Sequence, residues 1–236
     1  MESGSWVDKV KENLRSDAPI SVRDTLTQAW QIFTRNLCYL LPVAFLAQIP
    51  GLLGVSIMRS AQQSGGLWLT GVNVFTIVID VVVSTVVSVV LIKVIASDIA
   101  GTRVTIKEAF RGGRGSYIDY FGQKIALAIV TAIGIIILVL PGVYWGVLFS
   151  FAPFLVVLEG DQSENFFARS AKLVKGSFLS ILYISIILML PGIVLSFLFK
   201  LVSIQDSPQY LIHAVFSSFV SLFSTCVFVI AYFKLN

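Results

Sequence analysis

The chain has 236 residues, of which 56% are hydrophobic and only 13% are charged, and its formal net charge is +4. A soluble globular domain typically carries about 25% charged residues. Half that fraction cannot cover a protein surface in water, so lipid must solvate much of this molecule. The composition excludes an ordinary soluble domain and predicts an all-α integral membrane bundle with short loops and no separate catalytic domain.

Two amphipathic segments precede the first apolar run. Within residues 1–20, apolar side chains recur at helical spacing on one face, which predicts a short helix lying in the membrane interface. A second amphipathic helix follows Ser21, a residue type that favours the N-cap, and it leads directly into the first span at about 37–58. We expect residues 21–236 to form the transmembrane domain.

A long uncharged stretch predicts a helical hairpin in the middle of the chain. The 34 residues between Lys124 and Glu159 carry no charge. One helix of that length would span roughly 51 Å, whereas a bilayer core is about 30 Å thick. We therefore place a turn at Pro141–Gly142, with one span before it and one after it. The other spans are predicted at about 67–96, 178–199 and 211–233, which brings the total to six.

Lysine and arginine are distributed unevenly between the two sides of this bundle. Fifteen of the seventeen lie before the first span, in the polar loops at 97–124 and 159–177, or at span ends on the same side. Only Arg59 and Lys200 lie on the opposite side. Because cytoplasmic loops of membrane proteins are enriched in basic residues, we expect both termini to be cytoplasmic.

The dipeptide Pro–Gly occurs three times, each time after an aliphatic residue, at Pro50–Gly51, Pro141–Gly142 and Pro191–Gly192. Proline removes a backbone donor and clashes with the preceding turn. Each pair is therefore expected to end or kink its helix.

The spacing of these pairs suggests an internal repeat. Residues 21–95 align with 162–236 at an offset of 141 without a gap, and the middle copy needs about seven inserted residues. Coincidence among apolar segments is the alternative. We predict parallel units, each an amphipathic helix plus a membrane hairpin, at about 21–96, 104–158 and 162–236.

Three segments carry a resemblance to a known family: Ile20–Leu26 (ISVRDTL), Leu140–Tyr144 (LPGVY) and Phe151–Glu159 (FAPFLVVLE). Together they resemble the YciC-like bacterial membrane proteins, and they are similar to the membrane domain attached to some glycerophosphodiester phosphodiesterases. The resemblance covers about residues 20–236 and implies a bacterial inner-membrane bundle. The phosphodiesterase catalytic domain is absent, because its chemistry needs paired histidines and this chain has one histidine.

Asp80 is a charged residue near the middle of a predicted span, where a carboxylate costs roughly 2.5–3.5 kcal/mol to insert. We expect it to face the bundle interior. Small polar residues recur near Asp80 at helical spacing and form a polar stripe on one face of the span. This stripe could line a polar cavity or ion path between the second and last spans, or it could provide interhelical hydrogen bonds. Its members by helical spacing, with their uncharged counterparts in the last span, are Asn73, Thr76, Ser84, Ser88, Ser217 and Ser221.

The remaining polar residues suggest surface roles. Arg111 and Arg114 lie in a glycine-rich run, which we expect either to contact anionic lipid headgroups or to be a flexible insertion, and not to bind nucleic acid. Glu159 and the acids after it are expected to be solvated. We expect no metal and no cofactor, and the motifs of zinc proteases, α/β-hydrolases and P-loop proteins are absent from the sequence.

Two functions of different classes remain. The first is a non-enzymatic, envelope-associated scaffold that binds lipids, partner proteins or another copy of itself. The second is a transporter or channel for a small solute or lipid that uses the stripe around Asp80. An enzyme is the least favoured reading.

Overall fold

The computed structural model describes residues 21–61, 67–137, 139–160, 165–202 and 207–235. Throughout these ranges the regular structure is helical, with no strand, as the composition predicted. The interfacial helix expected within residues 1–20 lies outside the described residues.

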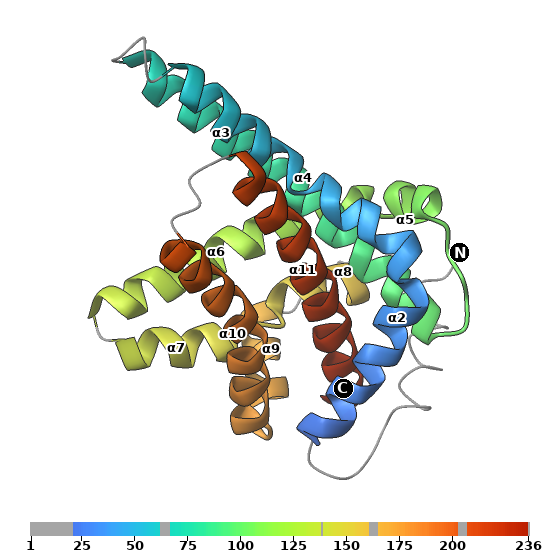
Figure 1. Cartoon of the computed structure of the whole chain (residues 1–236). Coiled ribbons are helices and arrows are strands. Elements are labelled where there is room, and N and C mark those ends of the chain that lie inside the picture. Colours follow the sequence, from blue (N-terminus) through green and yellow to red (C-terminus); the bar gives the residue numbers. More distant parts are fainter. Residues whose placement is uncertain (1–20, 62–66, 138, 161–164, 203–206, 236) are drawn as a thin grey trace.

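The first three helices set the long dimension of the molecule. They are α2 (Val22–Leu46), α3 (Ile49–Ala61) and α4 (Leu67–Ile99). Ser21 caps α2 as predicted, because its Oγ accepts a hydrogen bond from the Asp24 N–H at 3.4 Å. The axis bends by 41° between α2 and α3. α3 then packs along the first half of α4, and together they extend beyond the other helices (Figure 1). We call α3 with the first half of α4 the arm.

The middle of the chain forms a hairpin with a broken second leg. α6 begins seven residues before Lys124, so this lysine lies inside the helix and not ahead of it as predicted. The elements are α5 (Ile106–Gly112), the 3-10 turn η1 (Arg114–Ser116), α6 (Tyr117–Ile137), α7 (Val139–Leu148) and α8 (Ala152–Glu159).

The last three helices are α9 (Phe166–Lys175), α10 (Phe178–Val202) and α11 (Ser207–Leu235). α11 packs against α2 and α4, and it lies between α2 and α10 in Figure 1. Five helical stretches are long and apolar enough to cross a membrane, and the bent α2–α3 pair makes a sixth. The predicted helical membrane bundle is therefore confirmed.

The buried side chains gather at one end of the bundle. Large, fully buried residues there include Leu91 and Ile95 of α4, Leu155 of α8, and Ile230 and Tyr232 of α11. The helices are less buried elsewhere: Phe75 in the arm and Ile136 in α6 are 67% and 83% exposed. We call the region where α2, α8 and the last turns of α4 and α11 meet the packed end. Away from the packed end, apolar side chains can remain exposed because lipid, and not water, surrounds them.

The three Pro–Gly pairs do not form the predicted helix turns. Pro50 and Pro141 lie in the first turns of α3 and α7, so the helix breaks fall shortly before them. A first-turn position needs no intrahelical N–H donor, and proline fits there without loss. Pro191 lies inside the uninterrupted α10, so it does not end its helix.

One of the three Pro–Gly glycines, Gly142, lies where two helices approach closely. A Cβ built on Gly142 would lie 2.5 Å from the backbone nitrogen of Ile135, and one on Gly134 would lie 2.6 Å from the Gly142 Cα. Gly51 faces Asp80 across the α3–α4 contact, with 3.8 Å from its Cβ position to Asp80 Oδ1. Gly192 faces open space. Small residues of this kind let helix backbones approach in a membrane.

Candidate functional site: a basic cavity at the packed end

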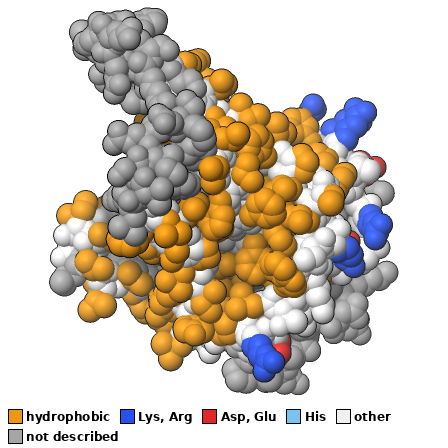
Figure 2. All heavy atoms as spheres, in the orientation of Figure 1, with side chains coloured by type: hydrophobic (Ala, Val, Ile, Leu, Met, Phe, Trp, Pro, Cys, Tyr) orange, Lys and Arg blue, Asp and Glu red, His pale blue; other side chains and the backbone are white. Residues whose placement is uncertain are grey.

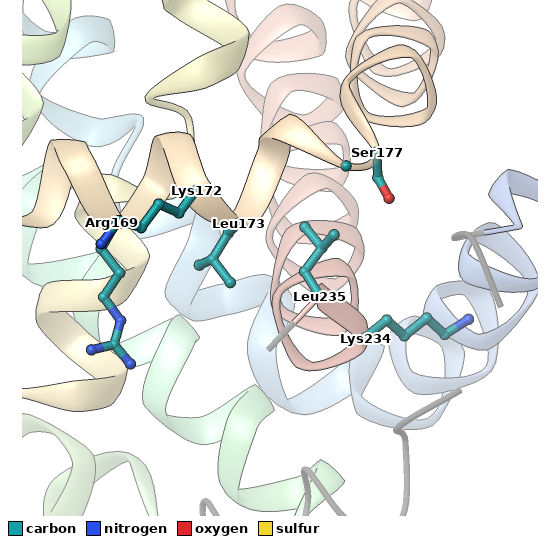
Figure 3. Close-up of a pocket in the computed structure, with 7 residues that line it drawn as sticks. Arg169, Lys172, Leu173, Ser177, Lys234 and Leu235 are labelled. Carbon is teal, nitrogen blue, oxygen red and sulfur yellow. The ribbon is translucent and has the colours of Figure 1, made fainter. Parts of the chain in front are cut away.

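A cavity of about 400 Å³ opens where α9 meets α10 and where α11 ends (Figure 3). Arg169 and Lys172 of α9 lie on one side of it and Lys234 of α11 on the other, with Leu173 and Leu235 between them. The described residues that line it are Arg169, Lys172, Leu173, Gly176, Ser177, Lys234 and Leu235. Among the residues that the structure describes, three basic side chains and no acidic one line this hollow.

Helix α9 is fixed in place by its cap and by one buried serine. Asn165 caps it, since its Oδ1 accepts from the Phe167 N–H at 3.0 Å. The buried Ser170 donates to the Leu148 carbonyl at 2.8 Å and accepts from the Phe151 N–H at 3.2 Å. Both partners lie at the break between α7 and α8, whose polar backbone groups lack helical partners. The two hydrogen bonds that Ser170 makes with these backbone groups therefore fix the orientation of the basic face of α9.

Arg169 is held by a buried carboxylate. Its Nε and Nη2 contact the two oxygens of Glu159 at 2.8 and 2.9 Å, and the Tyr232 hydroxyl donates to Glu159 Oε1 at 2.5 Å. The Glu159 side chain is only 5% exposed. Our expectation of a solvated loop acid at Glu159 was therefore wrong. A carboxylate can be buried here because a bidentate arginine and a phenol replace its hydration.

Lys234 joins the end of α11 to the start of α2. Its Nζ donates to Thr25 Oγ1 at 3.3 Å, and the Thr25 hydroxyl in turn donates to the Ser21 carbonyl at 2.9 Å. Figure 3 shows the Lys234 side chain extending away from Leu235. One wall of the cavity is thereby tied to the first turn of α2.

A second cavity, of about 360 Å³, lies between α2, the end of α4 and the start of α5. Asp98 accepts hydrogen bonds here from the Arg35 guanidinium and from Asn36 Nδ2, the latter at 2.7 Å. Arg103 also lines the hollow. The Asp98 side chain is 8% exposed, so this acid, like Glu159, is used to join two helices.

Basic side chains gather along one edge of the molecule, while apolar side chains cover most of the face shown in Figure 2. Arg111 and Arg114, the predicted lipid contacts, are both exposed and lie at the end of α5 and in η1. Lys93 Nζ donates to the Gly112 carbonyl at 2.5 Å, which ties this turn to α4.

Helix α5 begins with a reciprocal cap. The Thr105 N–H and hydroxyl both donate to Glu108 Oε2 at 2.9 Å, and the Glu108 N–H donates to Thr105 Oγ1 at 3.3 Å. The backbone hydrogen bond from Thr105, followed by the one from its hydroxyl, lowers the pKa of Glu108 below its ordinary value. The charged form of Glu108 is therefore the one that the folded helix favours.

Asp80 lies at the junction of the arm and α6. It is half-buried, with Gly51 of α3 next to it, and Lys124 of α6 is close enough for a coulombic interaction with it. Two turns further along α4, Ser88 donates to the Ser84 carbonyl at 2.7 Å and interacts with Tyr120 of α6. Lys124 also lies over the Tyr120 ring, 5.9 Å from its centroid. The stripe on α4 thus faces α3 and α6.

The other predicted members of the stripe are less closely associated with Asp80. Thr76 packs on Gly54, whose Cβ position lies 2.2 Å from Thr76 Cγ2. Ser217 contacts His213 Nδ1 of its own helix at 3.3 Å, and Ser221 is exposed. The side chain of Asn73 lies outside the described residues. The sequence pattern identified Asp80 as part of an intramembrane polar site. It did not identify Tyr120 and Lys124, and it placed Lys124 in a loop.

No group of three His, Cys, Asp or Glu side chains suited to a metal ion occurs in the described part of the chain. The helices, their apolar exposure and the basic edge define an all-helical integral membrane protein.

Residues 64–234 match the family described as "Domain of unknown function (DUF7847)", and the chain belongs to that family. No curated protein matches the chain. No solved structure matches it either.

Proposed function

We propose that this protein is a non-enzymatic scaffold of a bacterial inner membrane, with both termini in the cytoplasm and its basic edge against anionic lipid headgroups. The observation that carries the proposal is how two buried acids near this edge are used. Asp98 and Glu159 each bind an arginine and join two helices. These two acids thus stabilise the fold, while Arg111, Arg114 and Lys172 remain exposed.

Membrane lipids are the partners that this arrangement suits best. Anionic headgroups attract juxtamembrane basic side chains by about 1 kcal/mol for each lysine or arginine. The positive-inside distribution of the sequence and its resemblance to YciC-like proteins both favour the same orientation. A partner protein or a second copy of the chain could also dock at this edge.

Reconstitution of the full chain tests the scaffold directly. In nanodiscs, we expect the thermal midpoint to rise when phosphatidylglycerol replaces part of the phosphatidylcholine. In sealed vesicles that contain a pH-sensitive dye, we expect no proton leak above protein-free vesicles. A midpoint that is indifferent to lipid charge would contradict the proposal.

One observation supports a transporter as the second candidate. Asp80 and Lys124 place opposite charges within interaction range inside the spans of α4 and α6, beside Tyr120. Intramembrane charges of this kind often mark a proton or solute path. If the protein is a transporter, vesicle flux should be present and should be lost in both Asp80→Asn and Lys124→Gln. Ser196→Ala is the matched control, because Ser196 donates its hydrogen bond within its own helix, to the Gly192 carbonyl at 2.9 Å.

A further inference from the structure

The basic cavity adjoins an apolar groove, and we propose that the two together bind one anionic glycerophospholipid. The phosphate would lie in the cavity and one acyl chain in the groove. This inference rests on the proposed function and narrows it from a charged surface to one site.

The groove lies between the start of α2 and the first turns of α10. It is an open groove of about 400 Å³, lined by Val22, Leu179, Ser180, Leu182, Tyr183 and Ile186. Ser177 lines the basic cavity, and Leu179 and Ser180 follow it within one helical turn. Lys234 binds Thr25, one turn after Val22 on α2. The start of α10 therefore borders both hollows, and the start of α2 borders the groove and holds Lys234, which lines the cavity.

The charge of the cavity fits a phosphodiester. Glu159 holds Arg169 in position through two contacts, Lys172 is exposed, and Lys234 is held at Thr25. Within the described part of the chain, no acidic side chain lines the cavity. Hydrogen bonds between ammonium or guanidinium groups and phosphate oxygens are among the stronger ones in proteins, and basic pockets between membrane helices bind anionic headgroups.

The groove favours a lipid over a free anion. Its lining continues along α10 from Leu179 to Ile186, within the span that runs from Phe178 to Leu198. A soluble phosphate would use the cavity alone and gain nothing from this apolar extension. An acyl chain that enters the groove would cover side chains such as Leu179, which is 76% exposed.

The test compares the lipid with its separate parts, using the purified full chain in neutral detergent. Phosphatidylglycerol, phosphatidylcholine, deacylated glycerophosphoglycerol and inorganic phosphate are titrated one at a time, and the thermal midpoint and retained lipid by native mass spectrometry are recorded. We expect saturable binding of one phosphatidylglycerol. Phosphatidylcholine should bind more weakly, and neither soluble phosphate compound should raise the midpoint.

Matched variants locate the site. Lys172→Gln and Lys234→Gln should each weaken phosphatidylglycerol binding about fivefold, the effect of losing one headgroup charge. Lys175→Gln is the control, because Lys175 is an exposed lysine of the same helix that does not line the cavity. Ser180→Phe should fill the groove and reduce retention of the lipid, whereas Ile193→Phe, at an exposed position of the same helix, should not.

Each failure has its own meaning. If the wild type prefers phosphatidylglycerol but the cavity and groove variants bind it unchanged, this site is refuted while the proposed lipid-facing scaffold stands. If glycerophosphoglycerol or inorganic phosphate stabilises the chain as well as the lipid does, the cavity binds a soluble anion and the lipid proposal is wrong. If the wild type shows no preference for lipid charge, both proposals fall.

Discussion

The packed end and the hairpin legs of this protein use different interactions to hold helices together. The spans of α6 and α10 are only 11% buried, against 39% for the span of α7 and α8, which ends at the packed end, and 44% for α11. At the packed end, buried aliphatic and aromatic side chains combine with the ion pairs of Asp98 and Glu159. In the hairpins, close contacts at Gly54 and Gly134 bring the backbones together.

The difference follows from the solvent. Lipid tails are as apolar as leucine, so burying one apolar helix against another gains little from the hydrophobic effect. Helices there must rely on close van der Waals contact. Near the headgroups, polar side chains can pair without the full cost of burial in hydrocarbon. Four predictions test this contrast.

The largest effect is expected at Glu159. Glu159→Gln should lower the free energy of unfolding by about 3 kcal/mol, because it leaves Arg169 without its buried counter-charge. Denaturant titration in detergent would measure this change. Arg35→Ala is the comparison at the more exposed pair and should cost about 1 kcal/mol. Equal stability of Glu159→Gln and the wild type would show that the pair does not hold the packed end.

Gly134 tests the hairpin contact. Gly134→Ala should lower the free energy of unfolding by about 1–3 kcal/mol, since the new methyl group would meet the Gly142 backbone at 2.6 Å and force α6 and α7 apart. Gly192→Ala adds the same group where nothing lies within 4 Å. Thermal midpoints that fall equally in both variants would mean that the cost comes from something other than helix approach.

Asp80 lies between these two regions. Asp80→Asn keeps the shape and hydrogen bonding of the side chain and should change the free energy of unfolding by less than about 1 kcal/mol. Asp80→Leu should cost about 1–2 kcal/mol if polar neighbours then lose a partner. The two variants, compared by denaturant titration, distinguish a polar contact from space filling. A more stable Leu variant would indicate that Asp80 is a structural liability retained for another reason.

The smallest effect concerns Glu108, outside the spans. Its pKa is lowered in the folded chain, so its stabilising contribution is present above its ordinary pKa of about 4.3 and is lost as the pH falls through the lower folded value. Below about pH 5, the thermal midpoint of the wild type should therefore fall slightly more steeply than that of Glu108→Gln. Parallel pH profiles would show that the cap does not depend on charge.

Much of the fold could be predicted from the sequence because its long apolar segments are unambiguous. The expected span at 178–199 lies within α10, and α4 and α11 contain the spans predicted at 67–96 and 211–233. The breaks were placed less well. A Pro–Gly pair looks like a turn in sequence, yet proline is tolerated in a first helical turn, and the glycine can serve packing instead.

The candidate site was harder to predict because it depends on contacts between distant residues. Glu159 is followed by other polar residues in the sequence, and its burial depends on contacts with Arg169 and with Tyr232, 73 residues later. Lys124 was assigned to a loop because charge usually marks the end of a span. Its interactions with Asp80 and Tyr120 depend on how α6 is placed against α4, which the sequence alone does not give.

The proposed repeat stays a prediction, although the helix ends can be compared. At the offset of 141, the end of α10 at Val202 corresponds to the end of α3 at Ala61, and α11 starts one position before the counterpart of Leu67. The breaks differ. The first unit bends after α2, whereas the last is interrupted between α9 and α10. That interruption is where the basic cavity forms.

Cysteine labelling of intact and permeabilised cells tests the central claim most directly, that the basic edge faces the cytoplasm. Single cysteines are introduced at Gly115, Gln62 and Asp206 in a Cys38→Ala, Cys226→Ala background. Gly115 is exposed in η1, and a side chain there meets nothing within 4 Å. The account predicts that a membrane-impermeant maleimide labels Gln62→Cys and Asp206→Cys in intact cells but reaches Gly115→Cys only after permeabilisation. Labelling of Gly115→Cys in intact cells would contradict it.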